Sequence, residues 1–297
     1  MSGTASPSTG KPYGAVRVCS AWGVPRSSFY ASQRPAVTEP LPRGKRGPVT
    51  DVSDSELLAA IRDDLASSPF TGEGHRKVWA RLCFGKGMAV SRKRVLRLMR
   101  EDNLLSPHRA PQRPPREHTG EITTDAPNMM WGTDGSKVFT LTDGWGWIFA
   151  AVEHWNAEVM GCHVTKKGDR LAALEPVSQG IKQEFGHVGA QAARGLSLRM
   201  DHGSQYLSDH FQNQIRFWGM APSFAFLEQP QTNGVVERFF RTLKEQVIYG
   251  RVFENLEKVR EAVSGFVELY NERWIIEKNG YQSPRQAREA YLMEAAA

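Results

Sequence analysis

A proline-rich basic segment divides the chain and limits what can fold on either side of it. Residues 106–120 read SPHRAPQRPPREHTG and hold four prolines and three arginines. Proline lacks the backbone N–H that a helix interior or a central strand requires, so this segment can form neither. We expect an extended linker whose arginines can follow a phosphate backbone. The 297-residue chain is therefore predicted to contain at least two modules.

Basic charge gathers on the N-terminal side. Residues 73–118 carry 12 Lys or Arg against 4 Asp or Glu, whereas residues 119–297 carry 18 against 22. A basic arm on a mildly acidic module is typical of an enzyme that binds a polyanion and has a carboxylate site. Solvated surface charge is the alternative interpretation of any single cluster.

Several classes of protein do not fit this sequence. No apolar run approaches the roughly 18 residues of a membrane span, and the N-terminus lacks the apolar stretch of a signal peptide. The three cysteines are far apart, which argues against a disulfide framework or a zinc module. We expect a cytoplasmic protein with no membrane partner.

The part before the linker is predicted to be helical. Residues 1–50 indicate a mostly flexible basic segment with a partial helix-turn-helix around Gly23. Residues 51–105 predict a small helical domain, whose first helix begins after a cap at Asp54. Its second helix covers 75–84.

A third, basic helix begins after a cap at Ser91 and has Val95, Leu96 and Met99 as its apolar stripe. Two helices, a turn and a basic helix are what a helix-turn-helix needs to place one helix in the major groove. An ordinary bundle with a basic face is the alternative. The candidate DNA-binding residues of this helix are Arg92, Lys93, Arg94 and Arg97.

After the linker the pattern becomes α/β. Three meandering strands are followed by a helix and then by alternating strands and helices, which is the order of the ribonuclease-H-like fold. We predict a mixed five-stranded sheet flanked by helices, in a catalytic core over 121–275 with a C-terminal tail over 276–297. The predicted elements are strands at 129–140, 147–153, 158–165, 196–200 and 222–226, helices at 169–186, 208–218, 233–249 and 257–274, and a turn at 229–232.

Three carboxylates occupy positions typical of a metal site. Asp134 lies within the first strand, Asp201 follows the fourth, and Glu237 lies on the first turns of the long helix. A buried carboxylate must be paired or bind a metal. Converging carboxylates suit Mg²⁺, and a pair of such ions serves phosphoryl transfer.

The motifs around these acids allow a family to be named. They read DHGSQY at 201–206, PQTNGVVERFFRTLKE at 230–245 and GEGHRKVWARL at 72–82, and 35 residues separate Asp201 from Glu237. In this the chain resembles the DDE transposases of bacterial insertion sequences, which share a catalytic core with retroviral integrases. It is most similar to the second-reading-frame product of two-frame elements. The resemblance covers roughly residues 70–290 and implies Asp134, Asp201 and Glu237 as catalytic residues and ligands of Mg²⁺, with Mn²⁺ as a substitute.

The resemblance and helix geometry together suggest DNA contacts near the triad. Lys244 lies seven residues after Glu237, close to two helical turns, and Arg241 lies one turn after it on the same side. Gln205 and Asn233 are further candidates for polar contacts with the DNA end, although Asn233 could instead cap the helix.

The predicted function is transposition by metal-dependent end cleavage and 3′-OH strand transfer. A nuclease of the same fold and a non-catalytic DNA-binding regulator are the alternatives. The resemblance implies double-stranded DNA partners, namely element terminal repeats and target DNA, and a homo-oligomer on DNA. It also suggests a helix-turn-helix and zipper protein from an upstream frame, separate or fused, and a location at the bacterial nucleoid.

Overall fold

The computed structural model describes residues 2–33, 51–107, 123–225 and 233–296. The chain forms two compact units, Met1–Val49 and Thr50–Ala297. Most of the predicted proline-rich linker and the predicted turn at 229–232 lie outside the described residues. None of the helices within the described ranges is long and apolar enough to cross a membrane.

The first unit contains two short helices, α1 (Gly14–Ala21) and α2 (Arg26–Ser32). Gly23 lies in the turn between them with φ +64°, a conformation that glycine adopts without steric cost. Cys19 is buried, whereas Trp22 is 66% exposed. Two short helices joined by a glycine turn were expected here; that they form a partial helix-turn-helix stays a prediction.

The second unit begins with a three-helix domain. It consists of α3 (Asp54–Ser67), α4 (His75–Ala80), which continues as the π-helical turn η1 (Arg81–Gly85), and α5 (Arg92–Glu101). The prediction that Asp54 caps the first helix is wrong. The Ser53 hydroxyl accepts from the Glu56 N–H, and the Glu56 carboxylate accepts from the Ser53 N–H, which is a capping box. Asp54 is instead the first helical residue, and its carboxylate is free to pair with α5.

A mixed five-stranded sheet forms the centre of the catalytic core, as predicted. Its order is β3-β2-β1-β4-β5, with β1 antiparallel to β2, β2 antiparallel to β3, and the pairs β1–β4 and β4–β5 parallel. The strands are β1 (Met130–Thr140), β2 (Gly144–Glu153), β3 (Val159–Thr165), β4 (Ser197–Met200) and β5 (Ala221–Phe224). The ribonuclease-H-like order of strands and helices expected from the sequence is the order observed.

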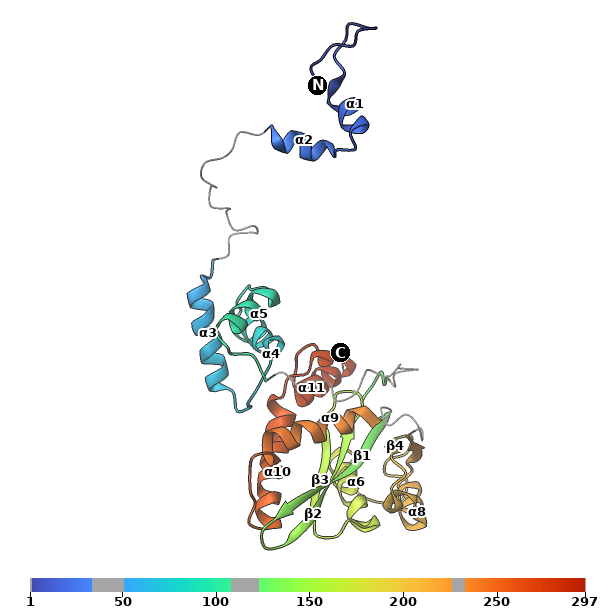
Figure 1. Cartoon of the computed structure of the whole chain (residues 1–297). Coiled ribbons are helices and arrows are strands. Elements are labelled where there is room, and N and C mark those ends of the chain that lie inside the picture. The colour runs from blue at the N-terminus through green and yellow to red at the C-terminus, as the bar shows by residue number, and fades with distance from the viewer. Residues whose placement is uncertain (1, 34–50, 108–122, 226–232, 297) are drawn as a thin grey trace. The chain divides into compact units, whose positions relative to one another are not determined.

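Helices cover both faces of this sheet (Figure 1). One hydrophobic cluster joins Val138, Ile148 and Ala150 of the strands to apolar side chains of α9 and α10. A second cluster joins Trp131 and Phe149 to α6 and α8. Because side chains alternate along a strand, the even-numbered residues of β1 face α9. The flanking helices are α6 (Arg170–Phe185), α7 (Ser204–Leu207), α8 (Asp209–Phe217), α9 (Gly234–Leu243) and α10 (Leu256–Arg273).

The predicted long helix over 233–249 changes geometry part-way. It is α-helical as α9 to Leu243 and continues as the π-helical turn η3 (Lys244–Ile248). A π-helical turn adds a residue to one turn of the helix and so rotates the side chains after it.

Residues 276–297, expected as a C-terminal tail, contain a 3₁₀ turn η4 (Glu277–Asn279) and helix α11 (Pro284–Ala296). Arg288 of α11 is buried and donates to the carboxylates of Glu158 and Glu184. A buried guanidinium needs such partners, so α11 is held against the β2–β3 end of the core.

The helical domain reaches into the catalytic core through the loop after α3. Phe70 belongs to the α9–α10 hydrophobic cluster and lies 4.9 Å from Trp274, ring centre to ring centre. The Thr71 N–H donates to the Gln246 carboxamide oxygen at 3.0 Å, and the Gln246 amide donates back to the Thr71 carbonyl at 2.9 Å. Gln246 lies in η3, so this loop contacts the segment that begins at Lys244.

Side chains of neighbouring helices form hydrogen bonds with the outer backbone edge of strand β3. Asn271 of α10 accepts from the Val159 N–H and donates to its carbonyl, both at 2.9 Å. Gln179 of α6 accepts from the Cys162 N–H at 3.1 Å, and Arg260 of α10 donates to the Val164 carbonyl at 3.2 Å. Four backbone groups that this edge strand could offer to another strand are thus already paired with side chains.

Candidate active site

Asp134 lies in the middle of β1, opposite Ala150 of β2, on the sheet face that α9 covers. One oxygen of its carboxylate accepts from the Gly135 N–H at 2.7 Å. The pKa of Asp134 is raised to about 6, mainly by burial and also by the nearby Asp201 and Glu237 carboxylates, whereas the Gly135 N–H and the Lys244 charge lower it. The ionised form of Asp134 is therefore disfavoured by burial and by two neighbouring acids, and the Lys244 charge only partly offsets this.

Asp201 follows β4, the parallel neighbour of β1. Gly132 of β1 pairs with Arg199 of β4. Asp134 lies two residues after Gly132, and Asp201 lies two residues after Arg199. Asp201 is exposed, and its carboxylate accepts from the Gly203 N–H at 2.9 Å. Its charge acts on the pKa of Asp134, which places the two carboxylates in one electrostatic environment.

Glu237 lies in the first turn of α9. The apolar stripe of this helix, with Val236, Phe239 and Phe240, is buried against the sheet and fixes the rotation of the helix. Glu237 stands on the outer side, partly desolvated, which raises its pKa. The three acids come from β1, the end of β4 and α9. The negative charges of Asp201 and Glu237 both raise the pKa of Asp134.

These residues fit a hard divalent cation by the chemistry of their oxygens and by their unneutralised charge. Within the described residues no group of three or more His, Cys, Asp or Glu side chains is close enough together to hold a metal ion. Two of the three carboxylates instead accept from the nearby N–H groups of Gly135 and Gly203.

Lys244 is the first residue of η3 and is partly buried. Its charge lowers the pKa of Asp134, so the ammonium belongs to the electrostatic surroundings of the acids. Arg241 is more exposed and pairs with Glu245 at 3.0 Å. Of the two cations predicted on this helix, Lys244 is the one associated with the carboxylates.

Asn233 does not cap α9 with its side chain. It is buried, and its amide donates to the Thr133 carbonyl at 3.2 Å, one residue before Asp134. This bond ties the start of the Glu237 helix to the Asp134 strand. Gln205, the other predicted polar contact, is partly buried next to Gly203 and Asp201.

A histidine missed by sequence reasoning lies beside Asn233. A side chain at Gly132 would meet the Asn233 oxygen at 2.7 Å and His154 Nε2 at 3.0 Å, so glycine is required at this position of the strand. Burial lowers the pKa of His154 to about 4, with help from the Lys278 and Arg199 charges, and the ring is neutral at pH 7. The sequence signal for this site is Gly132, two residues before Asp134. A glycine inside a strand weakens the strand, so its presence indicates that another group packs closely against the backbone there.

The basic helix α5 presents its candidate residues unequally. Arg92 and Lys93 are exposed. Arg94 is mostly buried and donates to Asp54 and to the Val52 carbonyl, and Arg97 pairs with Asp54 and with an acid on its own helix. Arg94 therefore serves the folding of the domain, whereas Lys93 extends into solvent.

Comparison with known proteins shows which families this chain resembles. The family model "Integrase core domain" matches residues 219–284, and the model "HTH-like domain" matches residues 54–112. Transposase InsD for insertion element IS2D of Escherichia coli strain K12 is 30% identical over 263 residues, which cover 85% of this chain and 83% of that protein. Transposase InsD for insertion element IS2H of the same strain matches equally well.

The chain belongs to the family of insertion-element transposases. The predicted function as a transposase and the predicted class of enzyme are thereby confirmed, and no comparison favours the nuclease or the non-catalytic regulator. Among solved structures, the HTLV-2 integrase catalytic core domain in complex with magnesium is 17% identical with a TM-score of 0.42 and covers 55% of this chain and 97% of that one. The catalytic core domain of BIV integrase is 21% identical with a TM-score of 0.40 and covers 57% of this transposase and 99% of that chain.

Proposed function

We propose that this transposase cleaves the ends of an insertion sequence and joins the freed 3′-OH groups to target DNA at a site formed by Asp134, Asp201 and Glu237. The observation that carries this proposal is the register of β1 and β4. Gly132 pairs with Arg199, and Asp134 and Asp201 each follow two residues later, on the sheet face that also packs against the Glu237 helix. Burial and the neighbouring Asp201 and Glu237 charges, which together raise the pKa of Asp134, support the same assignment.

We propose that the three carboxylates hold Mg²⁺, or Mn²⁺ in its place, as a pair of ions. Such ions, when bound, activate an attacking hydroxyl or water and stabilise the leaving 3′ oxygen. The chain's own part is to supply ionised carboxylates. Asp134 reaches that state above its pKa of about 6, and a bound cation favours it further.

Lys244 and Asn233 have supporting roles in this proposal. The Lys244 ammonium, which already acts on Asp134, holds a DNA phosphate beside the carboxylates. Asn233 is a positioning residue, because its bond to the Thr133 carbonyl keeps the Glu237 helix in place on the Asp134 strand. Arg241 and Gln205 are outer contacts to the DNA end.

The proposed partners are double-stranded DNA, as terminal repeats and as target, and further copies of the same chain assembled on it. The helical domain recognises the element end through α5, with Arg92 and Lys93 as its exposed cations. A helix-turn-helix and zipper protein from an upstream frame, separate or fused, is a further proposed partner. The proposed location is the cytoplasm, at the nucleoid.

The experiment is strand transfer with end-labelled duplexes that carry the element's terminal repeat. With Mg²⁺ we expect labelled strands joined to target DNA, and with EDTA no product. Cleaved ends without joined products, including from pre-cleaved substrates, would instead support the nuclease. Binding without either product would support the non-catalytic regulator.

A further inference from the structure

Two arginines of the helical domain converge on one carboxylate of the catalytic core. Arg76 of α4 lies 2.7 Å from one oxygen of Glu277, nitrogen to oxygen, and Arg92 of α5 lies 3.5 Å from the other oxygen. Glu277 is in η4, between α10 and α11. Two guanidinium groups from two helices thus form a site for a single anionic group, which this carboxylate occupies.

More positive charge surrounds this site than one carboxylate neutralises. The pKa of His75 is lowered by burial and then by the charges of Arg76, Arg92 and Arg100, so these basic side chains share one patch. Arg92 also lies 5.9 Å from the centre of the Trp79 ring, which orients its guanidinium. The patch is complementary to an extended polyanion rather than to an isolated carboxylate.

The contact with Glu277 is inexpensive to break. The side chains of Arg76, Arg92 and Glu277 are 59%, 49% and 50% exposed, and ion pairs so exposed stabilise a fold by about 0–1 kcal/mol. A phosphate offers two oxygens to an arginine in the same geometry and brings a neighbouring charge with it.

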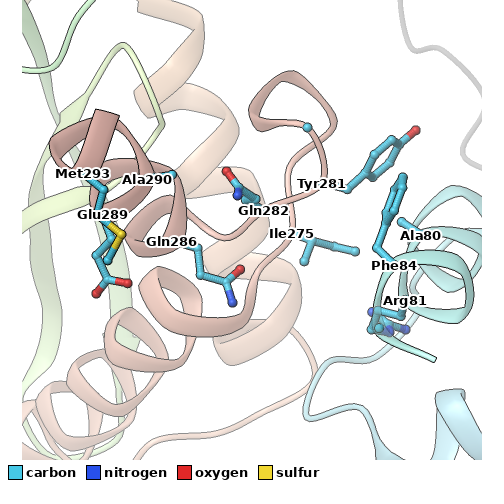
Figure 2. A pocket seen from close by; sticks show the side chains of 12 residues that line it. Ala80, Arg81, Phe84, Ile275, Tyr281, Gln282, Gln286, Glu289, Ala290 and Met293 are labelled. Carbon is cyan, nitrogen blue, oxygen red and sulfur yellow. The ribbon is translucent and has the colours of Figure 1, made fainter. Parts of the chain in front are cut away.

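An open cavity lies a few residues from Glu277 along the chain, at Gly280 and Tyr281. The helical domain and the C-terminal segment enclose this cavity, which has a volume of about 650 Å³. Figure 2 shows Phe84 and Tyr281 facing each other there, from the helical domain and the C-terminal segment respectively. Glu277 itself is half-exposed, so its carboxylate can leave the arginines without opening a hydrophobic core.

We propose that Arg76 and Arg92 together form a binding site for a backbone phosphate of the element-end DNA, and that the Glu277 carboxylate is a resident stand-in displaced when DNA binds. This inference rests on the proposed function in one respect, namely that the helical domain binds DNA. It adds Arg76, which lies outside the basic helix, to the DNA-binding surface. It also makes an acid of the catalytic core a competitor of the DNA.

The test compares Glu277→Gln with Glu272→Gln in the full chain. Glu272 forms a similar exposed pair with Arg285 at 2.9 Å, so its variant removes the same charge elsewhere on the C-terminal segment. Affinity for a terminal-repeat duplex and for an unrelated duplex of equal length is measured in EDTA over a range of salt concentrations. We expect Glu277→Gln to bind both duplexes about three- to tenfold more tightly, because a phosphate no longer competes with the carboxylate. Glu272→Gln should change affinity less than about twofold.

The arginines provide the second arm. Arg76→Ala should weaken binding and reduce the slope of log affinity against log salt by about one unit. In an Arg76→Ala, Arg92→Ala background, Glu277→Gln should bring no gain beyond that of Glu272→Gln. Thermal melting controls for folding.

Equal affinities for Glu277→Gln and Glu272→Gln would overturn the inference, as would a gain that persists without the two arginines. Either result leaves strand transfer, and so the proposed function, untouched. Failure of the wild-type chain to bind any duplex would overturn both.

Discussion

The helical domain and the catalytic site treat their charges in opposite ways. In the helical domain, acids and bases are matched: Asp54 pairs with Arg94 and Arg97, and Arg81 bridges Asp64 and Glu73. In the catalytic site, Asp134, Asp201 and Glu237 are like charges, and the pKa of Asp134 rises to about 6, whereas Arg97 and Arg94 lower the pKa of Asp54 to about 2.

This difference in charge pairing indicates how each region would bind a charged ligand. A domain whose charges are internally satisfied folds without DNA, and its cations must exchange a protein carboxylate for a phosphate. A site with unsatisfied negative charge loses stability until a cation arrives. In the proposed function, the first region is the DNA-recognition surface and the second is the metal site.

The largest effect should follow neutralisation of the unsatisfied acids. Asp134→Asn, Asp201→Asn or Glu237→Gln should each lower cleavage and joining by roughly 10³-fold or more, because each removes a metal-ligand charge with little change of shape. Binding to terminal-repeat DNA in EDTA should be unchanged. Near-wild-type joining by any one of these variants would remove that residue from the site.

The next effect concerns Lys244, the cation within the electrostatic reach of Asp134. Lys244→Ala should lower joining of pre-cleaved ends by about 10- to 100-fold, because the DNA phosphate loses its anchor beside the carboxylates. Lys244→Arg should be milder, since it keeps the charge.

Crosslinking at position 244 and thermal melting accompany this assay. An alanine variant with full joining activity, together with normal crosslinking at that position, would show that Lys244 is an ordinary surface residue.

A smaller effect is expected from Asn233. Asn233→Ala removes the bond to the Thr133 carbonyl, worth about 1 kcal/mol, and should lower joining about tenfold through misplacement of Glu237. Asn255 caps α10 by accepting from the Lys258 N–H, so Asn255→Ala is a matched control for lost stability. If both variants lose joining in proportion to their melting temperatures, Asn233 has only a structural role.

Two residues of the basic helix α5 are expected to differ in role, Lys93 in DNA binding and Arg94 in stability. Lys93→Ala should weaken DNA binding a few-fold and lower the salt slope by about one unit, with an unchanged melting temperature. Arg94→Ala should mainly lower the melting temperature, because it leaves Asp54 and the Val52 carbonyl without this donor. A variant pair with the reverse pattern would show that Arg94 faces the DNA.

The smallest expected effect is on the pH dependence of stability, and it tests the contrast between the two regions directly. Asp134 holds a proton more tightly in the folded state, with a pKa of about 6 against 3.8, so stability falls as pH rises from about 4 to about 6. Asp54, with a pKa of about 2, adds stability that is present above pH 4 and lost as pH falls through about 2.

At pH 7.5 in EDTA, Asp134→Asn should therefore stabilise the fold by about 1–3 kcal/mol, and Asp54→Asn should destabilise it. The gain from Asp134→Asn should vanish near pH 4. Thermal melting measures both, and shifts of the same sign would refute the contrast between the two regions.

Much of the fold could be predicted from the sequence because its signals are local. Periodicity and turn residues placed the strands and helices of the core close to their observed limits, and Ser91 caps α5 as expected. The positions of Asp134, Asp201 and Glu237 on their elements followed from the same patterns. Their role as ligands remains a prediction.

The rest depends on contacts between distant segments, which no local pattern encodes. Arg94 has the sequence context of a DNA-binding residue, yet Asp54, 40 positions earlier, occupies it. Asn233 has the context of a helix cap, but its partner lies 100 positions earlier on β1. The π-helical turn that begins at Lys244 likewise has no signature in residue spacing. A regular helix would place Lys244 on the same face as Glu237, and the π-helical turn changes that placement.

Both ends of the sheet are unsuited to extension. Side chains of Gln179, Arg260 and Asn271 satisfy the outer backbone of β3, and β5 at the opposite edge has only four residues, one of them Pro222, which has no N–H to offer. In the proposed assembly of several copies on one DNA molecule, we therefore expect no backbone pairing between these edges. Contacts through side chains would distinguish one partner from another and stay reversible, whereas backbone pairing tends toward aggregation.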